Sequence, residues 1–167
     1  EDEGSIEYEG KKEKFNSPKD ALEHRIGMVH QHFSLVPNLS VSQNVTLGLK
    51  EKGFPFVNRK ELDDKISQIS KKYGFGIYPS AKISELSVGE QQRVEIIKLL
   101  YRDAKLLILD EPTAVLTPQE VENFYDILRR LKDEGHSIII ITHKISEIME
   151  ISDKITVLRD GEKIVSL

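Results

Sequence analysis

Two adjacent carboxylates, Asp110 and Glu111, follow an uninterrupted apolar run at Leu106–Leu109. Such a run is typical of a parallel strand that is covered on both faces. The carboxylates would then lie at the carboxyl edge of the sheet, where open α/β sheets bind their ligands. Because the two residues are adjacent, one could hold a metal ion while the other addresses a water molecule. Taken alone, the pair is equally compatible with a solvated turn ahead of Pro112.

A second candidate site begins at Ser87. This residue is a favourable helix N-cap, and Glu90 three residues later completes the spacing of a capping box ahead of a helical apolar run. Gly89 in the first turn would let a ligand approach the backbone of a helix N-terminus, which is a natural anion site. By itself, a capping box indicates only the start of a helix.

Two further polar residues also follow apolar runs. Gln31 comes after Ile26–Val29, and His143 comes after Ile138–Ile141. A lone histidine after a strand is usually structural. However, the carboxyl ends of parallel strands meet at one edge of a sheet, so we expect Gln31, Glu111 and His143 to converge there.

The alternation of strand and helix patterns predicts a mostly parallel α/β sheet with flanking helices. Helices are expected at residues 19–24 and 144–150 and after the caps Ser87 and Thr117. A further helix is expected from the cap Asn58 to Tyr73, where Gly74 stops it. An antiparallel pair is expected around the Glu9-Gly10 turn. A last parallel strand is expected at Ile155–Leu158, with a hairpin return over Glu162–Val165. Residues 50–57 read as a linker broken by Gly and Pro.

Composition narrows the class of protein. The formal net charge is -4 and 31% of the residues are charged, which argues against binding to a nucleic-acid backbone. The chain has no cysteine, so it has no disulfide framework. His30 and His32 lack a third clustered ligand for a metal site. No apolar run reaches transmembrane length, so membrane contact is expected to go through a partner protein.

Ser87–Arg93, followed at this distance by a strand and Asp110-Glu111-Pro112, closely resembles the signature motif and Walker B segment of ABC-type ATPases. The resemblance covers essentially the whole chain. It implies a P-loop-NTPase-like sheet with a small helical subdomain in one partial domain. Residues 1–33 and 103–167 would form the sheet core, and residues from about 34 to 102 the Q-loop and helical subdomain.

ATPases of this class hold phosphates with a Gly-rich loop that ends in Gly-Lys-Ser/Thr. The Gly-Lys pair here, Gly10-Lys11, has Ser5 in place of the required glycine and Lys12 in place of Ser or Thr, so it is not a P-loop. The resemblance therefore implies a nucleotide-binding domain whose P-loop strand is not among these residues. We expect these residues alone to be inactive.

In the family's strand order, the P-loop strand lies between Ile138–Ile141 and Ile155–Leu158. Without it, we expect either association between copies or a detached C-terminal segment, rather than direct pairing of these two strands.

Departures from the family pattern indicate a subfamily. Val88 and Glu90 stand where Gly and Gln are usual, and Thr117 replaces the usual acid of the D-loop. With Gln91–Ile96, these features resemble the first ATPase domain of nucleoside and simple-sugar importers.

The resemblance also implies the residue roles. Asp110 would hold Mg²⁺, Glu111 would polarise the attacking water, and His143 would contact the γ-phosphate of ATP. Gln31, in the Q-loop, would contact both the metal and the water. Phosphoryl transfer by such groups consists of positioning and charge stabilisation.

Catalysis in this family needs a head-to-tail pair of domains. Ser87, Val88, Gly89 and Glu90 would bind the γ-phosphate of ATP held by the second nucleotide-binding domain. Phe33–Leu49 would face a transmembrane permease subunit, and a solute-binding protein would act indirectly. The protein would therefore lie at the cytoplasmic face of the cell membrane.

Three alternatives remain. A chromosome-maintenance ABC-type ATPase would share both motifs but would carry coiled-coil heptads, which this sequence lacks. A soluble ribosome-associated ABC-type factor would be favoured by a basic linker. A non-enzymatic interaction module would explain the missing phosphate loop.

Overall fold

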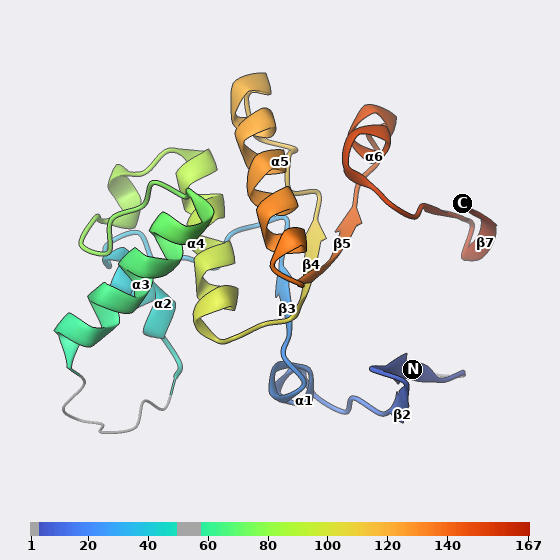
Figure 1. Ribbon diagram of the computed structural model, residues 1–167, viewed down its shortest axis with the longest axis horizontal. Coiled ribbons are helices and arrows are strands. Elements are labelled where there is room, and N and C mark those ends of the chain that lie inside the picture. The colour runs from blue at the N-terminus through green and yellow to red at the C-terminus, as the bar shows by residue number, and fades with distance from the viewer. Residues whose placement is uncertain (1–3, 50–57) are drawn as a thin grey trace.

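A three-stranded parallel sheet lies at the centre of the computed structural model, which describes residues 4–49 and 58–167. Its strands are β3 (Ile26–Val29), β4 (Leu106–Asp110) and β5 (Ser137–Ile141), in the order β3-β4-β5 (Figure 1). All three strands run in the same direction. The predicted parallel α/β fold class is confirmed.

One face of this sheet forms the core. Leu107 and Leu109 of β4 are fully buried, whereas Ile139 and Ile141 of β5 are 49% and 48% exposed. The apolar run of β5 predicts a strand covered on both faces, and this expectation is wrong. Among the described residues, β5 pairs only with β4, so its outer edge and one of its faces stay open.

Two helices cover the buried face. Helix α5 (Pro118–Asp133) begins with the predicted capping box, in which the Thr117 N–H donates to Glu120 at 2.9 Å. Helix α4 (Val88–Tyr101) packs against β3. Gly27 is required in β3 because a Cβ there would lie 2.7 Å from the Leu99 side chain.

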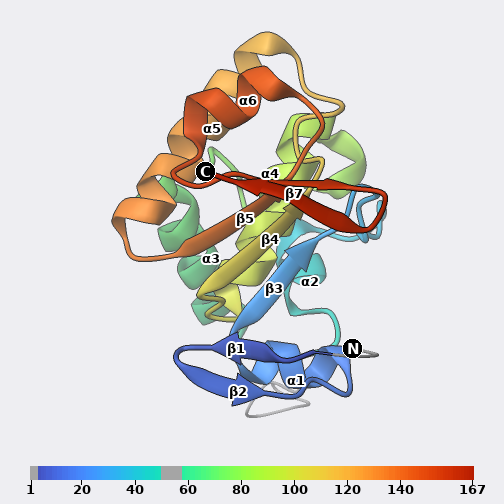
Figure 2. The same ribbon diagram turned by 90° about the vertical axis from the view of Figure 1, so that its right-hand side faces the viewer.

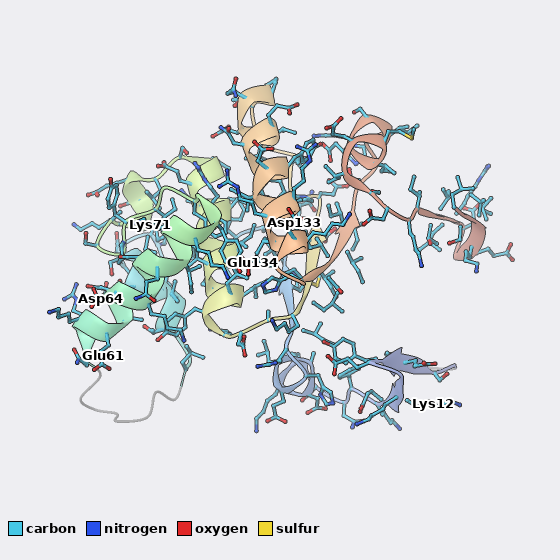
Figure 3. The ribbon with its side chains drawn as sticks, in the orientation of Figure 1. Lys12, Glu61, Asp64, Lys71, Asp133 and Glu134 are labelled. Atoms are coloured by element: carbon cyan, nitrogen blue, oxygen red, sulfur yellow. The ribbon has the colours of Figure 1, made fainter. Side chains whose placement is uncertain are left out.

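Helices α2 (Val41–Thr46) and α3 (Arg59–Tyr73) pack against α4. As expected, Asn58 caps α3, and Gly74 ends it with a φ of 75°. The end of α3 joins the end of α5 through the Lys72–Glu134 ion pair at 2.7 Å. Figure 3 shows these two ends side by side, marked by Lys71 and Glu134.

Helix α2 lies inside the stretch Phe33–Leu49, where the sequence shows apolar residues mixed with turn formers. Val41 and Val45 of α2 are fully buried, so these two residues belong to the core. Val36 and Leu47 remain 38% and 52% exposed. The linker expected at residues 50–57 lies outside the described residues.

The N-terminal part forms an antiparallel pair, as predicted. Strands β1 (Ile6–Tyr8) and β2 (Lys11–Glu13) join at Glu9 and Gly10, which both have positive φ. The remaining short helices are α1 (Pro18–Glu23), α6 (Ile145–Ile151) and the 3₁₀ turn η1 (Ile83–Glu85).

The last two strands, β6 (Thr156–Arg159) and β7 (Glu162–Ser166), form a hairpin of their own. The hairpin return is confirmed, but the expectation that the first of them is a parallel strand is wrong. The backbone groups of β6 pair with β7 in antiparallel fashion, and β6 joins neither β4 nor β5. Figure 1 shows this hairpin standing away from the sheet, and Figure 2 shows the open face of the sheet behind it.

We predict that these 167 residues associate in solution, because the outer edge of β5 presents unpaired backbone groups beside exposed isoleucines. Light scattering across a concentration series should show growing assemblies. Ile139→Lys, which places a charge on that face, should reduce association. A monodisperse monomer at every concentration, with residues 155–158 strongly protected from hydrogen exchange, would contradict the prediction.

Candidate active site

The carboxylate of Glu111 is contacted from the ends of both neighbouring strands. The Gln31 amide Nε2 donates to Oε2 at 3.4 Å, and Nδ1 of His143 lies 3.0 Å from Oε1. The first contact is at the long end of hydrogen-bond geometry, and the second is a good one. The structure therefore brings together the three residues that the sequence places after three separate strands.

The backbone of Glu111 is held in an unusual conformation. Its φ is 46°, in the left-handed region, which costs a non-glycine residue roughly 1–2 kcal/mol. Its N–H donates to the carbonyl of Ile141 at 2.8 Å, so the β4–β5 ladder continues past the last strand residue. Such strained residues cluster at functional sites, and here the strain turns the chain at the sheet edge.

Asp110 is the last residue of β4 and lies opposite Ile141 in the register. Asp110 and Glu111 are both half-buried, and the side chain of Glu111 is 30% exposed. Within the described ranges, no group of three or more His, Cys, Asp or Glu residues is arranged to hold a metal ion. A site for Mg²⁺ here would thus depend on oxygen donors from a bound phosphate as well as Asp110, which is how proteins commonly hold this ion.

Ser87, Val88, Gly89 and Glu90 form the first turn of α4 and are not members of the Glu111 contact group. The predicted capping box is present: the Ser87 N–H donates to Glu90 at 2.8 Å, and the Glu90 N–H donates to the Ser87 hydroxyl at 3.3 Å. Ser87 is exposed and Val88 is 46% exposed. This turn is thus open to a partner or ligand.

Gly89 has a packing role that the sequence does not reveal. It is buried against α5, and a Cβ at this position would lie 2.5 Å from Glu120 Oε1 and 3.3 Å from Leu116. The missing side chain therefore lets α4 approach the start of α5.

Sequence reasoning also missed a buried polar network behind Glu111. Glu147 on α6 is 6% exposed and accepts hydrogen bonds from the hydroxyls of Thr113 and Thr142. Lys144 pairs with Glu147 at 3.0 Å and donates to the Thr113 carbonyl, also at 3.0 Å. The network ties the segment after Glu111 to the segment around His143. The three-residue spacing of Lys144 and Glu147 was the sequence feature that could have indicated this ion pair.

Two neighbours of this network are also buried. Burial raises the pKa of Tyr125 to about 12, and the nearby Glu147 carboxylate adds to the rise. On the α4 side, the buried Gln92 amide donates to the Pro112 carbonyl. The chain after Glu111 is therefore held from both sides.

The fold defined by these elements is that of an ATP-binding cassette. A nucleotide-free ATP-binding cassette from an ABC transporter superposes with a TM-score of 0.84 at 22% identity, over 99% of this chain and 69% of that chain. A dimeric cassette in a post-hydrolysis state, bound to ADP and phosphate, superposes with a TM-score of 0.78 at 26% identity, over 99% of this chain and 73% of that chain.

The ABC transporter family matches residues 1–114, which is more than half of the sequence, and this chain belongs to that family. Within the described residues, no helix is long and apolar enough to cross a membrane.

Several curated relatives match almost the whole of this chain. A glucose import ATP-binding protein of Haloferax volcanii is 47% identical over 98% of this chain and 35% of its own length. A guanosine import ATP-binding protein of Bacillus subtilis is 49% identical over 98% of this chain and 32% of its own length. A ribose import ATP-binding protein of Escherichia coli O157:H7 is 39% identical over 98% of this chain and 32% of its own length. The chain thus spans about a third of the length of these relatives.

We predict that Glu147→Ala lowers the free energy of unfolding by roughly 1–3 kcal/mol, because it leaves the buried Thr113 hydroxyl without its acceptor. Urea denaturation measures this change. Glu150 is on the same helix as Glu147 and forms an exposed ion pair with Arg129 of α5. Glu150→Ala breaks that pair and should cost no more than about 1 kcal/mol. Equal losses in the two variants would contradict a special role for the buried network.

Proposed function

We propose that this chain is part of the ATPase subunit of an ABC importer and supplies the groups that position the hydrolytic water. The observation that carries the proposal is the convergence of Gln31 and His143 on the Glu111 carboxylate. A carboxylate that two side chains orient at a strand end is suited to accept a hydrogen bond from water.

In the proposed reaction, the oxygen of this water attacks the γ-phosphorus of ATP. The bond between that phosphorus and the β–γ bridging oxygen breaks, and ADP and phosphate leave. Glu111 orients the water and polarises it, and His143 contacts the γ-phosphate, where negative charge is spread in the transition state. Because His143 is 72% exposed on its side chain, it is accessible to a phosphate.

Asp110 and Gln31 are the residues that we expect to hold Mg²⁺, through oxygen atoms that suit this ion. When bound, Mg²⁺ neutralises charge on the phosphate oxygens. Asp110 is fixed in place by its strand pairing with Ile141 of β5, and Gln31 lies two residues beyond β3.

We expect a second nucleotide-binding domain to complete the ATP-binding site. Ser87, Val88, Gly89 and Glu90 would bind the γ-phosphate of ATP that the partner domain holds, since the start of a helix favours anions and Ser87 and Val88 are exposed there. The dimeric cassette with ADP and phosphate supports the pairing of two nucleotide-binding domains.

The relatives named for import of glucose, guanosine and ribose support a nucleoside or simple sugar as the transported solute. A transmembrane permease subunit would dock at Phe33–Leu49, where Val36 and Leu47 are exposed. A solute-binding protein would take part indirectly, and the subunit would lie at the cytoplasmic face of the membrane. On this proposal, residues 1–33 and 103–167 form the sheet core, and residues 34–102 the Q-loop and helical subdomain.

A second candidate function is that of an interaction module without ATPase activity. The feature that favours it is the absence of a Gly-rich phosphate loop from these 167 residues. Binding of a labelled ATP analogue to this chain separates the two candidates.

We predict that these 167 residues alone hydrolyse ATP no faster than background, because Asp110 and Glu111 have no phosphate cradle beside them. Phosphate release with Mg-ATP measures the rate, and Glu111→Gln is the control. Turnover that this substitution abolishes would overturn the prediction.

We also predict that, in a full-length protein that carries these residues together with a phosphate loop, Glu111→Gln traps ATP and lowers turnover by at least about a hundredfold. The amide keeps the shape of the side chain but cannot activate water. Near-normal turnover in this variant would rule out Glu111 as the general base.

Ser87→Arg should prevent productive pairing of the two domains, because it puts a bulky cation where the start of α4 must meet phosphate. Size-exclusion chromatography with ATP in the Glu111→Gln background measures the pairing. A Ser87→Arg variant that still forms the ATP-bound pair would contradict the proposed contact.

A further inference from the structure

An ion pair on α4, between the buried Glu95 and the partly buried Lys98, holds one backbone unit of the loop after β3. Glu95 is 7% exposed, and its Oε1 accepts a hydrogen bond from the Ser34 N–H at 2.7 Å. The ammonium of Lys98 lies 2.9 Å from Glu95 Oε2 and donates to the Ser34 carbonyl at 3.4 Å. One ion pair thus contacts both the N–H and the carbonyl of a single loop residue.

Such a pair is not explained by stability alone. Replacing a buried ion pair with apolar residues of similar size is often neutral or stabilising. The neighbours of Glu95 on α4, which are Val94, Ile96 and Ile97, are fully buried apolar residues. A charged pair among them gives the loop specific hydrogen-bond partners, which an apolar surface would not.

The loop after β3 is held at both ends, and Gln31 lies between the two ends. Val29 is the last residue of β3 and is fixed by its pairing with Leu109. Ser34 is fixed by Glu95 and Lys98. Gln31 lies between these two anchors, so they limit where its amide can reach.

We propose that Glu95 and Lys98 are positioning residues that clamp the loop after β3 and thereby place the Gln31 side chain on Glu111. The consequence for hydrolysis rests on the proposed function, whereas the clamp itself does not. Both residues act through Ser34 and Gln31 and touch none of the reacting atoms.

The same helix also contacts the loop after β4. Gln92, one turn before Glu95, donates to the carbonyl of Pro112, which directly follows Glu111. Glu95 lies eight residues after the cap Ser87, a distance of about 12 Å along a helix. Helix α4 therefore carries the candidate phosphate-binding turn at its start and contacts both active-site loops farther along.

The test uses hydrogen–deuterium exchange of the full-length protein, read in peptides that cover residues 30–36. Glu95→Ala removes the acceptor of the Ser34 N–H and should accelerate exchange there by at least about fivefold. Glu95→Gln keeps an acceptor oxygen and should restore exchange to within about twofold of the unsubstituted protein. Asp126→Ala is the matched control, since Asp126 forms an exposed ion pair with Arg129 at the same helical spacing on α5.

Acceleration confined to residues 30–36 in Glu95→Ala, with rescue by Glu95→Gln, supports the clamp. Unchanged exchange in Glu95→Ala, or equal acceleration in Asp126→Ala, overturns it. If Glu95→Ala fails to fold, Lys98→Met is the deciding variant: it keeps the stem of the side chain, and the clamp requires faster exchange of the same peptides.

Hydrolysis kinetics provide the second measurement. Glu95→Ala should lower kcat by about tenfold or more, because a loosened loop no longer holds Gln31 on Glu111. A full-length protein without ATPase activity overturns the proposed function, and the exchange measurement then decides the clamp by itself. Normal kcat in a Glu95→Ala variant whose loop exchanges faster shows that the clamp does not position Gln31.

Discussion

The parallel pairing of β4 with both of its neighbours is the constraint on which the candidate site depends. The register aligns Val29 with Leu109 and Asp110 with Ile141, so all three strands end at one edge. Gln31, Glu111 and His143 follow those ends within two residues, and their side chains meet there. A shift of one residue in either pairing would turn the side chains of the shifted strand to the opposite face.

Strand pairing alone does not fix the loops beyond the strand ends. The chain after Glu111 turns through a left-handed residue and is then held by Gln92 on one side and by Glu147 on the other. The chain after Gln31 is held at Ser34 by Glu95 and Lys98. A buried polar group that loses its partner is costly, so each of these contacts favours one arrangement of its loop.

The sheet has one open side, which is the outward face and the outer edge of β5. Leu107 and Leu109 face the helices and are fully buried, while Ile139 and Ile141 face outward. The β6–β7 hairpin satisfies its own hydrogen bonds instead of extending the sheet. The same chain thus holds the two loops of the candidate site firmly and leaves the outer edge of β5 without a partner in the described part.

The sequence alone determined the elements and the residues at their ends. The apolar runs predict β3, β4 and β5, the caps Asn58, Ser87 and Thr117 predict where three helices begin, and the polar residues after the strands predict the Glu111 group. These signals are local, because helix caps and apolar runs are patterns of neighbouring residues.

Only the tertiary structure decided which residues far apart in the sequence come into contact. The hydrogen bond from Ser34 to Glu95 and the fit of Gly89 against Glu120 join separate elements, and no local pattern encodes them. The sequence also misjudged β5 and β6, since an apolar run does not state which faces or edges have neighbours. Pairing and coverage depend on the strands and helices that are present to supply them, so they are properties of the assembled fold.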